Sequence, residues 1–178
     1  TTVNAQDYSG VTDLTLNGTL TVNTAGQGVT AGDVTLTGAS AIVLNGTDAG
    51  NDVTLGAVDG AQTFAITAAG GDVDLGVVGG TAPLTSLTIT SNTADLQAVT
   101  TSGAQNYTGV STTTLNGTLT VNAAGAGVSA GNVNLAAGGG AITLTGTNAG
   151  NDVTLGTVDG AQTLAVTATG GDIVLGVV

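Results

Sequence analysis

The segment TLNGTLTVN at residues 15–23 returns unchanged at residues 114–122, and AGNDVTLG at 49–56 returns at 149–156. Self-similarity at a fixed offset is the signature of repeat architectures, in which each unit buries its apolar face against its neighbours. The sequence therefore predicts a protein assembled from stacked repeats.

The long repeat has 99 residues at its start and 100 after a single-residue insertion near 137–139. One copy covers residues 1–99, and a second, partial copy covers residues 100–178. A shorter period runs through both copies, so we predict a single continuous segment over 1–178.

That shorter period appears as a series of segments with the pattern of DVTL. Their starts lie about 20 residues apart, the scale of one turn of a β-solenoid. They begin at Asp13, Asp33, Asp52, Asp72, Ala94, Thr112, Asn132, Asp152 and Asp172. A second series, which includes TLTVN at 19–23 and TFAIT at 63–67, lies between them. The pattern predicts about nine coils, with at least two short strands in each coil and about five coils in each long repeat.

Apolar and polar residues alternate within these segments. In TLTVN, for example, Leu20 and Val22 are expected to face inward while Thr19 and Thr21 face outward. Alternation with a period of two is typical of half-buried strands, and the 31 glycines are too frequent for helices. Asn-Gly and Gly-Gly pairs between the segments supply corners, because glycine readily adopts positive φ angles. The predicted fold class is an all-β, parallel β-solenoid; two tandem immunoglobulin-like modules fit less well, because the 20-residue period argues against them.

The composition excludes most kinds of chemistry. The chain has no Lys, Arg, His or Cys, and its 12 acidic residues, all Asp, give it a formal net charge of −12. Without those residues there is no imidazole or thiolate metal site, no disulfide and no Ser–His triad. We expect no nucleic-acid partner, because nothing neutralises phosphates, and no membrane insertion, because no apolar run approaches roughly 18 residues. We also expect no enzyme activity, because near-identical repeats offer no unique cleft.

The run GAQTFAITAAGGDVDLGVVGGTAPLTSLTIT at 60–90, followed by AVTTSGAQNYTG at 98–109, resembles the repeats of very large bacterial exoproteins of the filamentous-haemagglutinin type. The elements GAQ, GG-T-PL-SLT and TTSGAQ-Y-G carry the resemblance, which spans nearly the whole chain. It implies a right-handed parallel β-helix that is secreted to the cell surface and serves in adhesion or as a stalk. We therefore expect an extracellular structural segment of a surface fibre or adhesin. We expect it to associate head to tail into filaments and to contact other cell-surface components.

A calcium site is one interpretation of the aspartates that open equivalent strands. Stacked coils would bring such carboxylates within about 5 Å of one another, where like charges raise a pKa or recruit a cation. Calcium binds carboxylate and carbonyl oxygens, and GNDVTLG at 50–56 and 150–156 is similar to part of a calcium-binding nonapeptide. The other interpretation is that each Asp caps a turn at a solvated corner. The candidate ligands are Asp13, Asp33, Asp52, Asp72, Asp152 and Asp172. A calcium-dependent surface-layer lattice is the function that follows from the first interpretation.

Two further patterns concern the surface. Outward threonines could align on one face, as in solenoids that bind ice, although Thr is also a good strand former. These threonines are Thr15, Thr35, Thr54, Thr114 and Thr154, and an ice-binding β-solenoid is the alternative function that they suggest. Asn-x-Thr sequons, which could carry glycans in a secreted protein, begin at Asn17, Asn45, Asn106 and Asn116.

Overall fold

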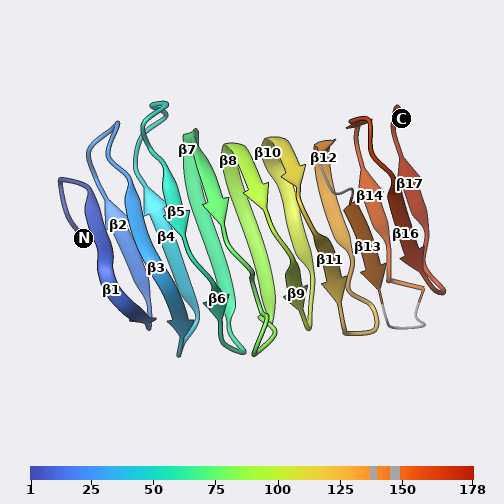
Figure 1. Cartoon of the computed structure of the whole chain (residues 1–178), viewed down its shortest axis with the longest axis horizontal. Coiled ribbons are helices and arrows are strands. Elements are labelled where there is room, and N and C mark those ends of the chain that lie inside the picture. The colour runs from blue at the N-terminus through green and yellow to red at the C-terminus, as the bar shows by residue number, and fades with distance from the viewer. Residues whose placement is uncertain (137–139, 145–148) are drawn as a thin grey trace.

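A computed structural model describes residues 1–136, 140–144 and 149–178. Over these residues the chain winds into a rod of stacked coils, with the N-terminus at one end and the C-terminus at the other (Figure 1). The regular secondary structure of the described residues is entirely β-strand. This part of the chain contains no helix that could span a membrane. The insertion predicted near 137–139 lies outside the described residues.

The strands are short and follow one another closely. In chain order they are β1 (Gln6–Leu16), β2 (Thr19–Val22), β3 (Val29–Leu36), β4 (Ser40–Leu44), β5 (Val53–Leu55), β6 (Val58–Asp59), β7 (Thr63–Leu75), β8 (Ser86–Leu96), β9 (Val99–Thr101), β10 (Gln105–Leu115), β11 (Thr118–Val121), β12 (Val128–Leu135), β13 (Gly140–Leu144), β14 (Val153–Leu155), β15 (Val158–Asp159), β16 (Leu164–Ala168) and β17 (Ile173–Leu175). The longer strands bend at corners: the register of β7 against β8 shifts between Ala68 and Asp72, beside Gly70, whose φ of 84° suits glycine.

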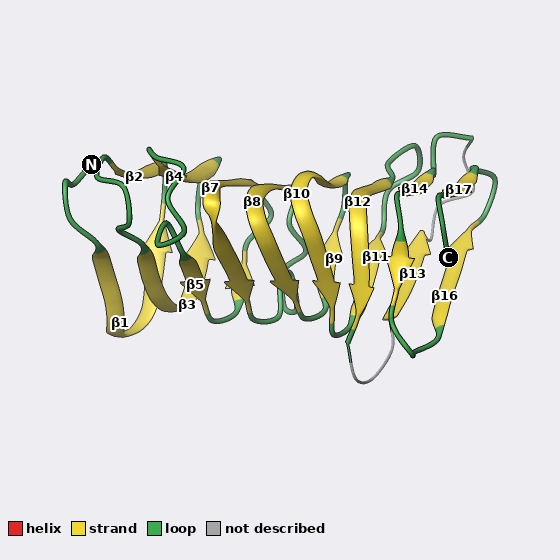
Figure 2. Cartoon of the chain, turned by 90° about the horizontal axis from the view of Figure 1, so that it is seen from above, coloured by secondary structure: helices red, strands yellow, loops and turns green. Residues whose placement is uncertain are grey.

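Neighbouring strands in the described residues pair in parallel. The larger sheet follows the path β1-β3-β5-β7-β8-β10-β12-β14-β17, and a smaller sheet follows β16-β13-β11-β9. Figure 2 shows these strands side by side along the rod. Parallel pairing of successive coils is the defining feature of a β-solenoid, so the predicted fold class is confirmed. The right-handed winding stays a prediction, in keeping with the hand of nearly all parallel crossovers.

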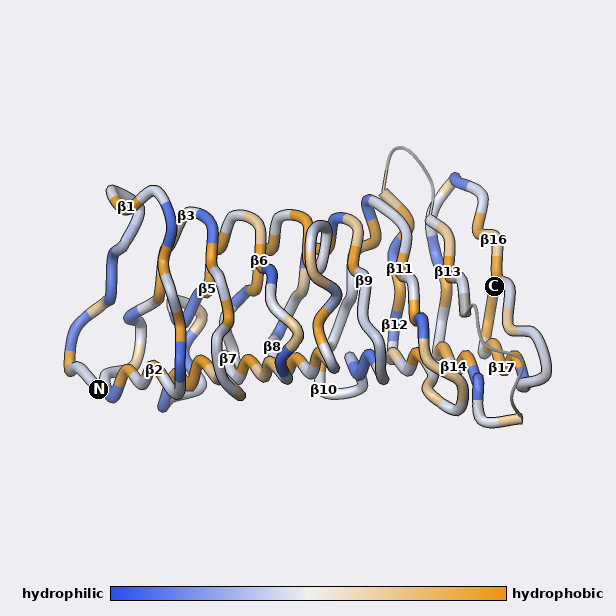
Figure 3. Tube along the Cα trace, turned by 90° about the horizontal axis from the view of Figure 1, so that it is seen from below, coloured by the Kyte–Doolittle hydropathy of each residue, from blue (hydrophilic) through white to orange (hydrophobic). Residues whose placement is uncertain are grey.

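Rows of inward-facing side chains form the core, and three of these rows, one for each of three strand positions around a turn, trace the winding of the chain. The first row is Gln6, Val29, Val53, Val73, Ala94, Thr113, Val133 and Val158. The second row is Leu14, Val34, Val58, Val78, Val99, Leu119, Ile142 and Val166. The third row is Ser40, Phe64, Leu87, Gln105, Val128, Val153 and Ile173. The predicted alternation is confirmed: Phe64 and Ile66 are buried while Ala65 and Thr67 are exposed, and hydropathy alternates along the strands in Figure 3.

The number of coils differs from the prediction. The solenoid has about seven turns of about 22 residues, and the expectation of about nine coils of 20 residues is wrong. The turn from Val53 to Val73 does take 20 residues, but the turn from Val29 to Val53 takes 24. The additional residues lie in the corner loop 45–52, so the strand that begins at Val53 stacks on Val29 and not on Val34.

As a result, the two copies of the long repeat are rotated relative to one another. Gln6 belongs to the first inward row, whereas Gln105, its counterpart in the second copy, belongs to the third row. Four turns beyond Gln6 the first row reaches Ala94, and the fifth turn ends at Thr113. Because these rows mark three strand positions around a turn, the long repeat corresponds to four turns and about two thirds of a fifth. Equivalent surfaces of the two copies therefore face different directions around the rod.

Disulfide cross-linking tests the register at the junction of the two copies. Asp95 and Thr114 are paired on adjacent turns, so the double variant Asp95→Cys/Thr114→Cys should cross-link readily on mild oxidation. The chain has no other cysteine to interfere. The control pair Asp95→Cys/Thr112→Cys should remain reduced, because Thr112 pairs with Thr93 and its Cα lies beyond the usual ~7 Å limit. Efficient cross-linking of the control pair alone would contradict the register.

Candidate functional site

The six aspartates predicted as calcium ligands form three separate pairs on adjacent turns. The pairs are Asp13 with Asp33, Asp52 with Asp72, and Asp152 with Asp172. Asp33 and Asp52 are not neighbours, because the turn after Asp33 places Ala57 beside it. The six carboxylates therefore do not form one continuous column along the rod.

The carboxylate oxygens of these pairs accept hydrogen bonds from the next turn. The Oδ1 atom of Asp33 accepts from the backbone N–H of Ala57 at 2.9 Å, and the Oδ1 atom of Asp52 accepts from that of Asp72 at 2.9 Å. Asp72 accepts from the Thr93 hydroxyl at 2.7 Å. These bonds match the interpretation in which Asp caps a corner. The described residues contain no group of three or more acidic side chains arranged to hold a metal, and calcium binding stays a prediction.

A further pair of like charges lies on Asp74 and Asp95. These residues are paired between β7 and β8, on adjacent turns of the same face. Partial burial, and then the charge of Asp74, raise the pKa of Asp95, while a hydrogen bond from the Asn116 amide opposes the rise. Asp7 shows the opposite behaviour: hydrogen bonds from Ser9 lower the pKa of its exposed carboxyl.

The glycosylation sequons lie at the surface. Asn17, Asn45 and Asn106 are exposed, and Asn116 is half-buried. Two of these side chains have partners on the protein: the Asn45 amide donates to Asn23 Oδ1 at 2.7 Å, and Asn106 Oδ1 accepts from the backbone N–H of Thr108 at 3.0 Å. Glycosylation stays a prediction at all four positions.

The five outward threonines do not form the single row that an ice-binding face would need. Thr15 lies beside Thr35 on the next turn, but Thr54 lies between Thr30 and Asp74. Thr114 lies beside Asp95. Within the first copy, the additional residues of loop 45–52 place Thr54 in a different row from Thr35. Between the copies, the rotation places Thr15 and Thr114, which are equivalent in the repeat, in different rows.

A buried polar network interrupts the aliphatic core, and the sequence patterns above did not single it out. Gln105 is 1% exposed, and its amide donates to Thr120 O at 2.9 Å and to Thr101 Oγ1 at 3.2 Å. The hydroxyl of Tyr107, which is also fully buried, donates to Gln105 Oε1 at 3.1 Å, and burial raises the pKa of Tyr107 far above its usual range. Because Thr120 lies on the following turn, Gln105 holds two turns in register.

The same network recurs in the first copy. There Gln6 donates to Thr2 Oγ1 at 3.1 Å and to Thr21 O at 3.0 Å, while the Tyr8 hydroxyl donates to Gln6 Oε1 at 2.9 Å. The signal that could have revealed it is the recurrence of Gln-x-Tyr one long repeat apart, with Gln at a position that otherwise faces the core.

GNDVTLG, the motif similar to a calcium-binding nonapeptide, has a structural role at a corner. Asn51 is fully buried, and its Oδ1 atom accepts from the backbone N–H of Gly26 at 2.7 Å. Asn151 makes the equivalent bond with Gly125 at 2.6 Å. The amide nitrogens of Asn51 and Asn151 have no hydrogen-bond partner. Each asparagine thus ties its own corner loop to the corner loop of the preceding turn.

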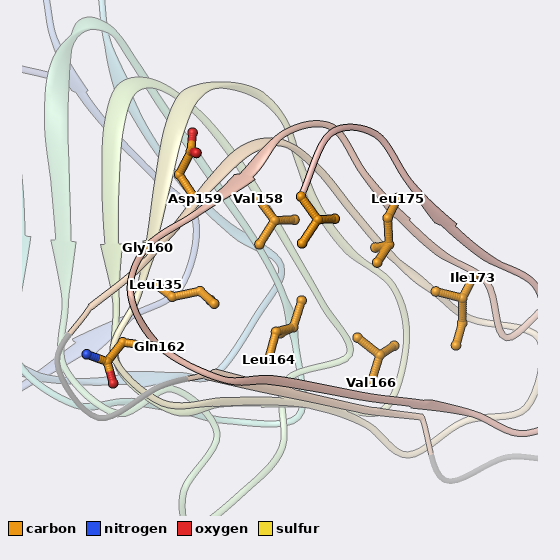
Figure 4. A pocket seen from close by; sticks show the side chains of 10 residues that line it. Leu135, Val158, Asp159, Gly160, Gln162, Leu164, Val166, Ile173 and Leu175 are labelled. Atoms are coloured by element: carbon orange, nitrogen blue, oxygen red, sulfur yellow. The ribbon is translucent and has the colours of Figure 1, made fainter.

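A hollow lies beside the last turns of the described residues. It has a volume of about 530 Å³, and Leu164, Val166, Ile173 and Leu175 point into it from the last turns (Figure 4). Asp159 and Gln162 lie at its edge. Its lining is mostly aliphatic, and the lining residues include no constellation of acid, base and nucleophile.

No known family model, no curated protein and no solved structure matches this chain. Its class is therefore defined by its own fold: it is a parallel β-solenoid built from a long internal repeat.

We expect Asp95→Asn to stabilise the protein at neutral pH. A folded-state pKa above the unfolded value of about 3.9 means that folding favours the protonated carboxyl. The stability that protonation supplies is present below the unfolded pKa and is lost as the pH rises through the folded pKa. Thermal unfolding at pH 7 should show a gain of less than ~1 kcal/mol for the variant, because the group is largely solvated, and the gain should vanish near pH 3.

Asp7→Asn is the control with the opposite sign. The pKa of Asp7 is lowered in the folded protein, so its ionised form stabilises the fold above the unfolded pKa and this stability is lost as the pH falls through the folded pKa. The variant should lower the Tm at pH 7 and leave it unchanged in acid. Tm changes of the same sign for Asp95→Asn and Asp7→Asn at pH 7 would contradict the opposite pKa shifts of the two carboxyls.

Tyr107→Phe tests the buried network. The change leaves the Oε1 atom of Gln105 without its donor in a dry core, which should cost about 1–3 kcal/mol of unfolding free energy in urea titrations. The matched variant is Tyr8→Phe, which removes the same bond at the half-buried N-terminal turn, where water can replace the donor. Equal losses in the two variants would show that burial of the network is irrelevant.

Proposed function

We propose that this chain is a structural rod segment of an extracellular bacterial surface fibre or adhesin of the filamentous-haemagglutinin type. In this role it is mechanical and not catalytic. It serves cell-surface attachment or contact between cells by holding other parts of the fibre at a distance.

The observation that carries the proposal is the continuity of the solenoid across the junction of the two copies. Strand β8 of the first copy and β10 of the second pair at eight positions, from Gln105 with Leu87 to Leu115 with Leu96. The core also passes through the junction without a break, since Leu87, Leu96 and Leu115 are all buried. Added copies would therefore lengthen one rod, by about 22 Å for each long repeat at ~4.8 Å per turn.

The composition supports a location outside the cell. A chain without Lys or Arg has no cleavage site for trypsin-like proteases, and a net charge of −12 keeps neighbouring rods apart. The resemblance of 60–90 and 98–109 to exoprotein repeats points the same way. We further propose that the rods associate head to tail and contact other components of the cell surface.

Surface labelling of cells that produce the protein tests this proposal. Antibodies raised against the chain should decorate intact cells in immunogold electron microscopy, on fibres that extend from the envelope. Permeabilised cells should show little additional label. Label confined to the interior of permeabilised cells would overturn the proposal.

Treatment with a chelator distinguishes the rod function from a calcium-dependent surface-layer lattice. The aspartate oxygens already accept hydrogen bonds from neighbouring turns, so we expect the Tm and the assembly state to be unchanged by EDTA. A fall in Tm on chelation that calcium reverses, and magnesium does not, would favour the lattice instead.

A further inference from the structure

One side of the rod carries no charged residue along its described length. It is formed by the outward residues of β2, β4, β14 and β17 and of residues 63–67, 86–90, 105–109 and 128–130, and we call it the neutral face. A column of its outward side chains, taken from six successive turns, is Ala41, Ala65, Thr88, Asn106, Ser129 and Thr154. The neutral face therefore combines parts of both copies and runs past their junction.

The 12 aspartates all lie within the described residues, and none of them is on the neutral face. Seven are outward residues at the other two strand positions around a turn: Asp7, Asp74, Asp95, Asp159, Asp13, Asp33 and Asp59. The other five lie at the bends between strand positions: Asp48, Asp52, Asp72, Asp152 and Asp172. The charge of the rod is thus confined to two of its sides and to the bends.

This distribution limits how two copies of the chain can meet. Each copy has a net charge of −12 and no cationic side chain to pair with a carboxylate of another copy. Contact through a charged side would bring Asp74 and Asp95, or Asp13 and Asp33, close to carboxylates of the partner, and like charges that meet across an interface oppose association strongly. Contact through the neutral face keeps these four carboxylates away from the partner.

The side chains of the neutral face also suit close contact. They are the short side chains of Thr, Ala, Ser, Val and Asn. Short side chains lose little conformational entropy when they are covered, and β-branched Thr and Val have few rotamers to lose. The parallel pairing of the strands arranges them in regular rows, so two such faces can approach to the ~10 Å spacing of packed sheets.

We propose that the neutral face is a lateral contact between two copies of this chain. A second copy fits it because it brings the same uncharged and regular surface, so the contact is closed by two-fold symmetry. Eight strands about 4.8 Å apart, each with about four residues of ~3.3 Å, give roughly 450 Å² per copy. A total of roughly 900 Å² is typical of weak, reversible interfaces. The inference rests on the proposed function and deepens it, since it names the surface through which rods of a fibre lie side by side.

Sedimentation velocity of the purified chain tests the proposal. We expect a monomer–dimer equilibrium that shifts toward the dimer as the protein concentration rises. Raising NaCl from about 20 mM to about 500 mM should strengthen the association, because the Debye length falls from about 20 Å to about 4 Å and the charges of the other two sides are screened. Small-angle X-ray scattering should show a dimer with nearly the length of the monomer.

Two results would overturn the lateral contact. One is a dimer with nearly twice the length of the monomer, which would mean that the rods meet end to end. The other is a chain that stays monomeric at about 1 mM in the higher salt, which would leave the neutral face to a neutral ligand such as a glycan.

Charge variants locate the contact. Thr67 is exposed on the neutral face, and Thr67→Asp should weaken dimerisation at least about tenfold. Thr67→Asn has nearly the same shape without the charge and should change it less than about twofold. Thr30→Asp is the matched control, because it adds the same charge between Asp7 and Thr54 on a charged side, and its effect should stay below about threefold. Equal effects of Thr67→Asp and Thr30→Asp would overturn the proposal, since net charge alone would explain them.

The outcome is independent of the labelling experiment. If the chain stays monomeric while gold decorates surface fibres, the lateral contact fails and the rod function stands. If the chain forms the expected dimer while the label is found only inside cells, the lateral contact stands and the surface function fails.

Discussion

Parallel hydrogen bonding between successive turns is the constraint on which this structure depends. It sets a spacing of about 4.8 Å between turns and places each residue directly beside one residue of the next turn. An inward side chain must then stack on another inward side chain, which produces continuous rows of mostly Val, Leu, Ile and Ala. A narrow core of this kind is filled by small aliphatic groups, so the near absence of aromatic residues is a consequence of the fold.

The same constraint makes the length of each corner loop decisive. The loop 45–52 adds residues to one turn without disturbing the pairing of Val53 with Val29 and Val73. The additional residues are accommodated at the corner, where the buried Oδ1 atom of Asn51 accepts a hydrogen bond from the backbone N–H of Gly26 in the neighbouring loop. Since the long repeat then corresponds to a fractional number of turns, successive copies present equivalent surfaces in different directions. A rod of this kind displays any repeated surface feature around its axis, not along one face.

An acidic chain without cations must separate or solvate its charges. Most of the aspartates lie at corners or on outward strand positions, where they accept hydrogen bonds from amides and hydroxyls of the adjacent turn, as Asp33 and Asp72 do. At Asp74 and Asp95, which are paired on adjacent turns, partial burial and then the charge of Asp74 raise the pKa of Asp95. The polar groups inside the core are likewise paired with partners on adjacent turns. Gln105 accepts a hydrogen bond from the Tyr107 hydroxyl and donates one to the Thr120 carbonyl.

The sequence by itself determined the solenoid, the strands and the inward residues. Alternation and repetition can be read directly from the order of the residues, without knowing which segments meet in space. Phe64 and Ile66 could be placed in the core from their neighbours alone. The number of turns and the rows in which residues meet were decided only by the tertiary structure. A corner loop can gain a few residues while the alternation within the strands stays the same. As a consequence, Asp33 and Asp52 lie on different faces although they occupy equivalent positions in the short repeat. The candidate surfaces depend on that long-range register, because they are set by which turn lies beside which.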